Sequence, residues 1–497
     1  MLSFLIIIPF LGGIISWFSQ KFSNKLPRFF AITSIILIFF INCLFFLNNV
    51  FEKFLFFNKN LFNNSFSILC IHKLGINFSL YNDRFSLYMI FLTVLLGMFV
   101  IIFSYNENYK NPGAFYLNIL FLISSIIGSL LSTNLFFFFI FLEIMIFPIC
   151  FLNIFWGKNK IKKKNNINYI KNFFIHSQIS SAILFFSILM LVNYYHSING
   201  IWTFEFNLLK KVFLNRNFIE NLILYGLLLS FIIKIPLIPF HTWLPNMTLY
   251  SPKGNSVDLI GFLSKVGIYG LLRFFVPISG NIFYKIQIFM IFLGIINVFY
   301  GAFMASVKNN LKHILSYINI SHSGIILLSI FNFNNLSYEG LLLYIISSTI
   351  SSSVLFVLSD KIYNELNTYN LKKMGGLWKV LNFIPGFFLF FSLSNFGLPG
   401  TGNFISEILI FMGFFLSFPK ISIFFTFSLI FFAFCSLKMF HRIFYGNSKN
   451  CLKNFDLNVF EILLISFFIF LLILIGLFPN FVFYKFNFLN IFSINIS

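Results

Sequence analysis

The stretch from Phe231 to Phe275, FIIKIPLIPFHTWLPNMTLYSPKGNSVDLIGFLSKVGIYGLLRFF, decides how the chain folds. Two lysines, Lys234 and Lys265, stand in otherwise apolar runs of it. A charged side chain in hydrocarbon costs roughly 2.5–3.5 kcal/mol on insertion scales. Pro236 and Pro239 interrupt the helix that carries Lys234, because proline lacks a backbone N–H. An interrupted helix with a buried cation is typical of an ion pathway.

The composition is that of a membrane protein. Of 497 residues, 59% are hydrophobic and 9% are charged, whereas a soluble domain has about 25% charged residues. Many apolar runs are long enough to span a bilayer as helices, and too long for the strands of a barrel. The sequence therefore predicts an all-α polytopic membrane protein. The net charge of +21 does not indicate nucleic-acid binding, because the lysines fall in short loops between apolar runs.

About fourteen spans are expected. Their approximate ranges are 2–19, 29–48, 85–104, 115–132, 134–153, 170–193, 219–240, 254–277, 284–305, 310–331, 337–359, 382–413, 420–445 and 456–479. Loops after odd-numbered spans, to which Lys312 and Lys361 are assigned, hold about twice as many Lys and Arg residues as the others. The bias predicts that these basic loops are inside and both termini are outside.

Two loops have patterns of their own. The run KNKIKKKNN from Lys158 is interpreted as an orientation signal, with a site for anionic lipid or a partner as the alternative. The segment SFSILCIHKLGINFSLYND, which ends at Asp83, alternates apolar and polar residues and predicts a short outer hairpin.

Glu143 and Lys234 are the first candidate site residues. Glu143 lies in FFFFIFLEIMIFPICF and is either a protonated core carboxyl or the partner of a buried lysine. Lys234 either extends to an interface or works as a proton carrier, because a buried lysine can gain and lose a proton near neutral pH. The functional interpretation is favoured for both.

Further candidates lie later in the chain. Asp258 stands seven residues before Lys265, so the two share a helix face, although Asp258 is also explained as a helix-entry residue. His322, flanked by serines, is either a hydrogen-bonded core residue or a proton relay. His241 lies near a span end, where an ordinary structural role is favoured.

Glu407 follows a second helix break, in LSNFGLPGTGNFISEILIF. Gly397, Pro399, Gly400 and Gly402 cannot continue a helix smoothly. The two breaks occupy corresponding positions in two halves of the chain, as a duplicated transporter fold predicts.

No redox or nucleotide chemistry is expected of this chain. The five cysteines form no CxxC pair or cluster, and neither a phosphate-binding loop nor a dinucleotide fingerprint occurs. The chain itself is therefore expected to hold no metal and no cofactor.

Several motifs now resemble one known family. They are FLEIMIFP, IPFHTWLP, SVDLIGFLSKVGIYGLLRF, LKHILSYINISHSG, KKMGGL and GLPGTGNFISE, spread in order over nearly the whole chain. Together they resemble the antiporter-like subunits of respiratory complex I, the NADH–quinone oxidoreductase. Related subunits of Mrp-type cation/proton antiporters are the alternative.

The resemblance implies fourteen helices with two inverted five-helix repeats (helices 4–8 and 9–13) and discontinuous helices 7 and 12. It implies domains at 1–112, 113–280, 281–446 and 447–497. Glu143 and Lys234 would form an ion pair, Lys265 the central relay, His322 a connection and Glu407 the exit. The chain would pump protons as a non-redox subunit of the enzyme.

The resemblance also implies surroundings. NADH, FMN, Fe–S clusters and quinone would be bound by other subunits. The partners would be other complex I membrane subunits, especially two neighbouring antiporter-like ones, and the lipid bilayer. The membrane would be the bacterial inner membrane or, alternatively, the mitochondrial one.

Three positions depart from the family pattern. Asn246 and Thr248 stand where the family usually has an aspartate and a histidine, and Ser348 stands where a histidine is frequent. A serine can hydrogen-bond a water chain but cannot hold a proton near neutral pH. The departures therefore bear on the efficiency of the relay.

Overall fold

The computed structural model describes residues 2–50, 65–105, 107, 109–157, 163–212, 218–252, 258–446 and 456–483. Within these residues, eleven helices are long and apolar enough to cross a membrane. They lie in α1 (Leu2–Ser19), α2 (Leu26–Val50), α3 (Arg84–Ser104), α4 (Pro112–Leu131), α5 (Leu135–Trp156), α6 (Lys163–Asn199), α11 (Val276–Val307), α12 (Leu311–Phe331), α13 (Asn335–Leu366), α16 (Pro419–Phe444) and α17 (Val459–Leu477). The prediction of a polytopic helical membrane protein is confirmed.

Two interrupted helices lie where the sequence predicts them. The first consists of α8 (Phe218–Lys234) and α9 (Trp243–Tyr250), and the second of α14 (Ile384–Ser394) and α15 (Gly402–Ser417). Buried asparagines satisfy backbone groups at both breaks: Asn297 Oδ1 accepts from Ile238 N at 3.1 Å, and Asn403 Nδ2 donates to Ser394 O at 2.7 Å. Such partners are what a break inside a bilayer requires.

One further irregularity was not expected. After α10 (Asp258–Gly270) the chain makes a π-helical turn, Leu271–Phe275, and then enters α11, which kinks at Gly280. Gly280 has a φ of 46°. This backbone conformation is unfavourable for residues with a Cβ, and glycine adopts it readily because it has none. The sequence predicts an uninterrupted span over 254–277, which the π-helical turn contradicts, whereas Gly280 lies between the predicted spans 254–277 and 284–305.

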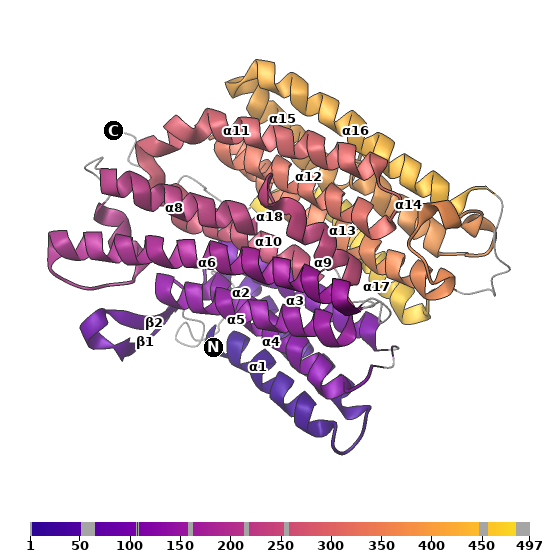
Figure 1. Cartoon of the computed structure of the whole chain (residues 1–497), viewed down its shortest axis with the longest axis horizontal. Helices are drawn as coiled ribbons and strands as arrows, with labels where there is room; N and C mark the ends of the chain where they lie inside the picture. Colours follow the sequence, from indigo (N-terminus) through magenta and orange to yellow (C-terminus); the bar gives the residue numbers. More distant parts are fainter. Residues whose placement is uncertain are drawn as a thin grey trace. The chain divides into compact units, whose positions relative to one another are not determined.

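The chain divides into two compact units. One contains residues 1–234 and 258–280, and the other contains 235–257 and 281–497. In the first, α1 packs on α4, α4 on α5, α5 on α6 and α6 on α8 (Figure 1). In the second, α12 packs on α13, α13 on α15, and α15 on both α16 and α17.

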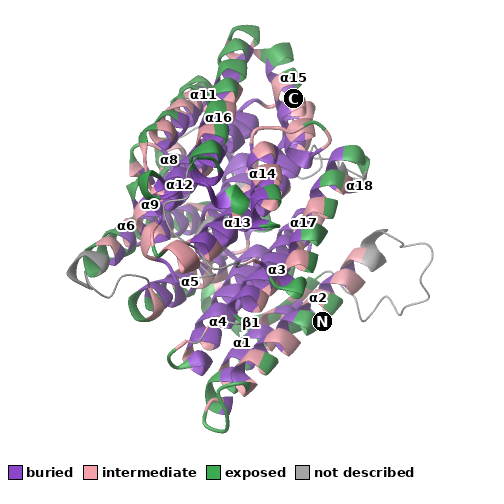
Figure 2. Ribbon diagram, turned by 90° about the vertical axis from the view of Figure 1, so that its right-hand side faces the viewer, coloured by how far each residue is buried: buried purple, intermediate pink, exposed green. Residues whose placement is uncertain are grey.

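Burial differs between the helices (Figure 2). Of the apolar windows of α12 and α13, 89% is buried, against 33% for α2 and α17. On the less buried helices the exposed residues are large and apolar, such as Phe40 at 67% and Phe470 at 60%. An extended apolar surface of this kind is unfavourable in water, and it suits contact with lipid.

The loop before α3 contains the predicted hairpin. Strands β1 (Ser65–Ile71) and β2 (Ile76–Tyr81) pair antiparallel, with Ser65 opposite Tyr81. The turn between them ends at Gly75, whose φ of 62° favours glycine. Asp83 then begins α3 by accepting a hydrogen bond from Ser86 N at 2.9 Å.

Two short helices follow longer ones, α7 (Phe206–Leu209) after α6 and α18 (Asn480–Phe483) after α17. The run of lysines from Lys158 lies largely outside the described residues.

Candidate functional site

In the first unit, α5 positions Glu143 and the last residue of α8 is Lys234. Lys234 is 5% exposed, and its Nζ has no hydrogen-bond partner among the described residues. Glu143 is half-buried and accepts a hydrogen bond from Gln178 Nε2 of α6 at 3.0 Å. Its charge acts on Lys234, yet no ion pair joins the two in the described part of the chain. The carboxylate is thus held by α6 while the ammonium stays buried at the helix break.

Lys265 lies on α10 and is 8% exposed. The π-helical turn begins at Leu271, six residues further on. Such turns re-aim side chains and occur frequently at functional sites. Within this turn, Arg273 forms an ion pair with Asp83. The backbone of Asp258 begins α10, but its side chain lies outside the described residues.

In the second unit, His322 and Glu407 both lie near a tyrosine of α13. His322 on α12 is 2% exposed, and its Nδ1 lies 2.5 Å from the Tyr344 hydroxyl of α13. Glu407 on α15 is 4% exposed, and its charge acts on Tyr344. The ring of Phe432 stacks on His322 with centroids 5.4 Å apart. Three helices thus bring an imidazole, a phenol and a carboxyl into one buried cluster.

The backbone of the second break lies directly against Glu407. A Cβ built on Gly397 would lie 2.5 Å from Glu407 Oε2, and Gly397 has a φ of 83°. Both the conformation and the space therefore require glycine. The break gives the carboxyl a close backbone neighbour that an unbroken helix could not supply.

The remaining candidates have local partners. The hydroxyl of Ser348 donates to Tyr344 O at 2.5 Å, within its own helix. His241 is 6% exposed in the first break, and its Nε2 lies 3.0 Å from the Tyr300 hydroxyl. Thr248 is buried and donates to Pro245 O at 3.0 Å, while Asn246 is half-buried.

The sequence missed one buried charge cluster. Lys312 was assigned to an inner loop, but it lies in α12, is 0% exposed and has its Nζ 3.0 Å from Asp360 Oδ1. Lys312 Nζ also donates to Ser251 Oγ at 3.2 Å, and the hydroxyl of Tyr369 donates to Asp360 at 2.5 Å. Burial and then the Asp360 charge hold the pKa of Tyr369, in the loop after α13, well above its usual value. The phenol therefore remains a donor.

Lys361 needs the same correction. It was also counted among the loop lysines, but it lies in α13 and forms an ion pair with Glu461 of α17. Each lysine lies beside a carboxylate that is distant in the sequence. The sequence alone therefore does not show that either lysine is paired inside a helix bundle. In the described residues, no group of three or more His, Cys, Asp or Glu side chains is placed to hold a metal ion.

The fold and these buried groups define an antiporter-like membrane subunit. The family described as "NADH:quinone oxidoreductase/Mrp antiporter, TM" matches residues 132–433. A relative in Buchnera aphidicola subsp. Schizaphis graminum, "NADH-quinone oxidoreductase subunit M", is 42% identical over 97% of this chain and 96% of its own length. The chain therefore belongs to the antiporter-like family of NADH-quinone oxidoreductase M subunits.

Solved structures agree on the fold. A chain of respiratory complex I from Thermus thermophilus superposes with a TM-score of 0.83 at 22% identity, covering 97% of this chain and 96% of that one. A chain of the Mrp complex from Dietzia sp. gives 0.71 at 18% identity, covering 90% and 80%. The sequence-based resemblance to complex I is confirmed by the family match and the relative.

Proposed function

We propose that this chain translocates protons across the membrane as a subunit of NADH–quinone oxidoreductase, driven by electron transfer from NADH to quinone in other subunits. The observation that carries the proposal is the burial of Lys234, Lys265, His322 and Glu407 within membrane helices. Buried ionisable groups are costly in a bilayer and mark ion pathways. NADH, FMN, Fe–S clusters and quinone belong to other subunits in this proposal.

The relay has two parts, one in each unit. In the first, Glu143 and Lys234 form a pair whose approach and separation change how readily the lysine holds its proton, and Lys265 passes the proton on. In the second, His322 and Tyr344 connect to Glu407 as the exit. Gln178 competes with Lys234 for the carboxylate of Glu143. When Gln178 holds the carboxylate, the Glu143–Lys234 pair is separated.

The phenol of Tyr344, unlike the hydroxyl of Ser348, contacts the next group of the relay. Ser348 donates to a carbonyl of its own helix, whereas the hydroxyl of Tyr344 contacts His322 directly. A phenol can accept a proton from one neighbour while giving its own to another. This role compensates for the absence of a histidine at position 348.

The proposed membrane arrangement has fourteen crossings. The eleven long helices are joined by three irregular ones, namely α8–α9, α10 with its π-helical turn, and α14–α15. In this arrangement, helices 4–8 and 9–13 form two inverted repeats, and helices 7 and 12 are the discontinuous ones. The corresponding segments are 1–112, 113–280, 281–446 and 447–497. The partners are the other membrane subunits, especially the two neighbouring antiporter-like ones, in the bacterial inner membrane.

The test compares wild type with Glu143→Gln in inverted membrane vesicles. NADH oxidation by quinone and proton uptake are measured together, and we expect both to fall about tenfold or more while the complex still assembles. The reason is that the neutral amide, unlike the carboxylate, does not stabilise the protonated form of Lys234. Glu339→Gln, another half-buried carboxyl within a span, is the matched control and retains both activities. Wild-type oxidation and pumping in Glu143→Gln would remove Glu143 from the mechanism.

A further inference from the structure

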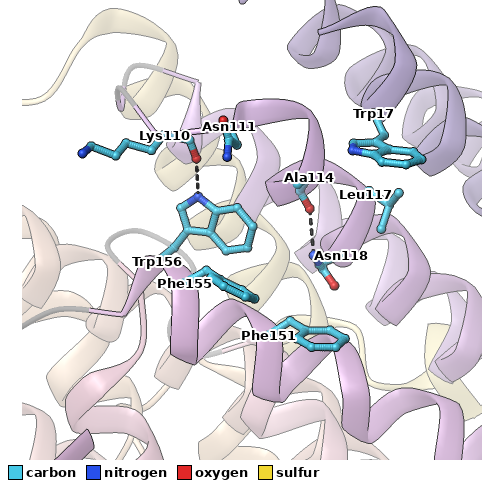
Figure 3. Close-up of a pocket in the computed structure, with 9 residues that line it drawn as sticks. All are labelled: Trp17, Lys110, Asn111, Ala114, Leu117, Asn118, Phe151, Phe155 and Trp156. Carbon is cyan, nitrogen blue, oxygen red and sulfur yellow. Dashed lines mark hydrogen bonds between the residues drawn. The ribbon is translucent and has the colours of Figure 1, made fainter. Parts of the chain in front are cut away.

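A cavity lies where the ends of three helices of the first unit meet. Its volume is about 590 Å³, and its lining includes Trp17, Leu117, Phe151, Phe155 and Trp156 (Figure 3). Trp17 is in the last turn of α1, Trp156 ends α5, and α4 begins at Pro112 beside them. Because all three helices begin or end here, the cavity is at the membrane–water boundary.

The cavity wall is held in place by hydrogen bonds. Trp156 Nε1 donates to Lys110 O at 2.7 Å, which fixes the indole against the loop before α4. Gln20, at the end of α1, accepts from Gly113 N at 3.0 Å. Asn118 donates to Ala114 O at 2.8 Å, as Figure 3 shows. The apolar walls are therefore preformed and do not depend on an occupant.

The rim of the cavity is basic. Lys110 lines it and extends outward from it (Figure 3). Lys21 and Lys25 follow α1 and are exposed. Arg28 donates to Glu107 O at 2.9 Å, so the start of α2, which follows the loop after α1, lies beside the loop that carries Lys110. Indole rings favour the headgroup level of a bilayer, and basic pockets there attract anionic headgroups.

We propose that this cavity binds one anionic phospholipid of the inner leaflet. Its phosphate would face the lysines of the rim. One acyl chain would lie along Phe151, Phe155 and Leu117, whose rings and methyl groups offer no competing polar contact. Charge complementarity selects the lipid, since a zwitterionic headgroup carries no net charge for the basic rim. The bound lipid would cover the apolar ends of α1, α4 and α5 with hydrocarbon.

The test uses the full chain reconstituted in vesicles with a small, equal fraction of brominated phosphatidylglycerol or brominated phosphatidylcholine. Bromine quenches tryptophan fluorescence on contact. We expect phosphatidylglycerol to quench more strongly, and the difference to disappear in Trp17→Phe/Trp156→Phe, which removes both indoles that line the cavity. In Lys21→Gln/Lys110→Gln, the preference for phosphatidylglycerol over phosphatidylcholine should fall about fivefold for each lysine that contacts the lipid. Lys211→Gln, an exposed lysine in a loop of the other predicted face, is the control and leaves it unchanged.

Equal quenching by the two lipids in the wild type would overturn the proposal without reference to any variant. A difference that survives in Trp17→Phe/Trp156→Phe would place the selective site elsewhere. If neither lipid quenches Trp17 or Trp156, protein rather than lipid covers the cavity, which also contradicts the proposal. None of these outcomes depends on proton pumping. A failure of the lipid proposal would therefore not contradict the proposed function, and the reverse also holds.

Discussion

Tyr344 is the residue on which the second half of the relay depends. Replacement by Phe keeps the ring and removes the hydroxyl that lies 2.5 Å from His322 Nδ1. Because the imidazole then loses its connection towards Glu407, we expect Tyr344→Phe to lower NADH-driven proton uptake about tenfold or more. Uptake by membrane vesicles at equal complex content measures this.

Tyr338→Phe is the matched control for that change. Tyr338 is also a buried phenol of α13, but it donates to Ile330 O at 3.1 Å, outside the His322–Glu407 cluster. Its loss removes one hydrogen bond of about 1 kcal/mol and should leave pumping near the wild-type level. Equal effects of the two variants would show that both act through stability alone.

The residues that sequence reasoning could and could not find differ in one physical respect. Lys234 and Glu407 are recognisable because a charge in an apolar run is costly whatever surrounds it. Lys312 lies close to the end of a predicted span and the sequence assigns it to a loop, because its buried partner Asp360 is contributed by another helix. Tyr344 carries no charge, and only its contact with His322 distinguishes it from the other tyrosines.

At the scale of elements, both helix breaks could be predicted, because proline and glycine act locally. The π-helical turn at Leu271–Phe275 could not, because its residues are ordinary helix formers and only packing selects the wider turn. The helix α6 also extends past both ends of the predicted span 170–193. Its polar ends lie beyond the apolar core of the span, where hydropathy gives no signal.

The second break itself makes a testable prediction. Gly397→Ala combines an unfavourable backbone conformation with a collision against Glu407, since the added Cβ would lie 2.5 Å from Oε2. Gly400→Ala shares only the conformation, because φ is 91° and nothing lies within 4 Å of the added Cβ. We expect both to destabilise the chain by about 1–2 kcal/mol. Only Gly397→Ala should also lower proton uptake.

Thermal inactivation of the solubilised complex and proton uptake by vesicles separate these two effects. Gly386→Ala in α14 is the control, since nothing lies within 4 Å of its added Cβ and its φ does not favour glycine. It should leave proton uptake unchanged and should not lower thermal stability, because alanine is favoured over glycine within a helix. Equal pumping in Gly397→Ala and Gly400→Ala would mean that the contact with Glu407 has no part in translocation.

At the scale of the whole molecule, the charge distribution predicts which loops face inside, and two native cysteines report it. Cys70 is exposed on the hairpin between α2 and α3, on the face predicted to be outside. Cys451 follows α16, in a loop that the lysine bias assigns to the inside. Cys150 and Cys435 are buried.

A membrane-impermeant maleimide added to spheroplasts should therefore label Cys70 at once, and Cys451 only after the membrane is permeabilised. Cys70→Ser removes the outer signal and serves as the control. Labelling of Cys451 from outside would reverse the orientation, and with it the assignment of the basic cavity to the inner leaflet, because anionic lipid is attracted by the same lysines that orient the chain.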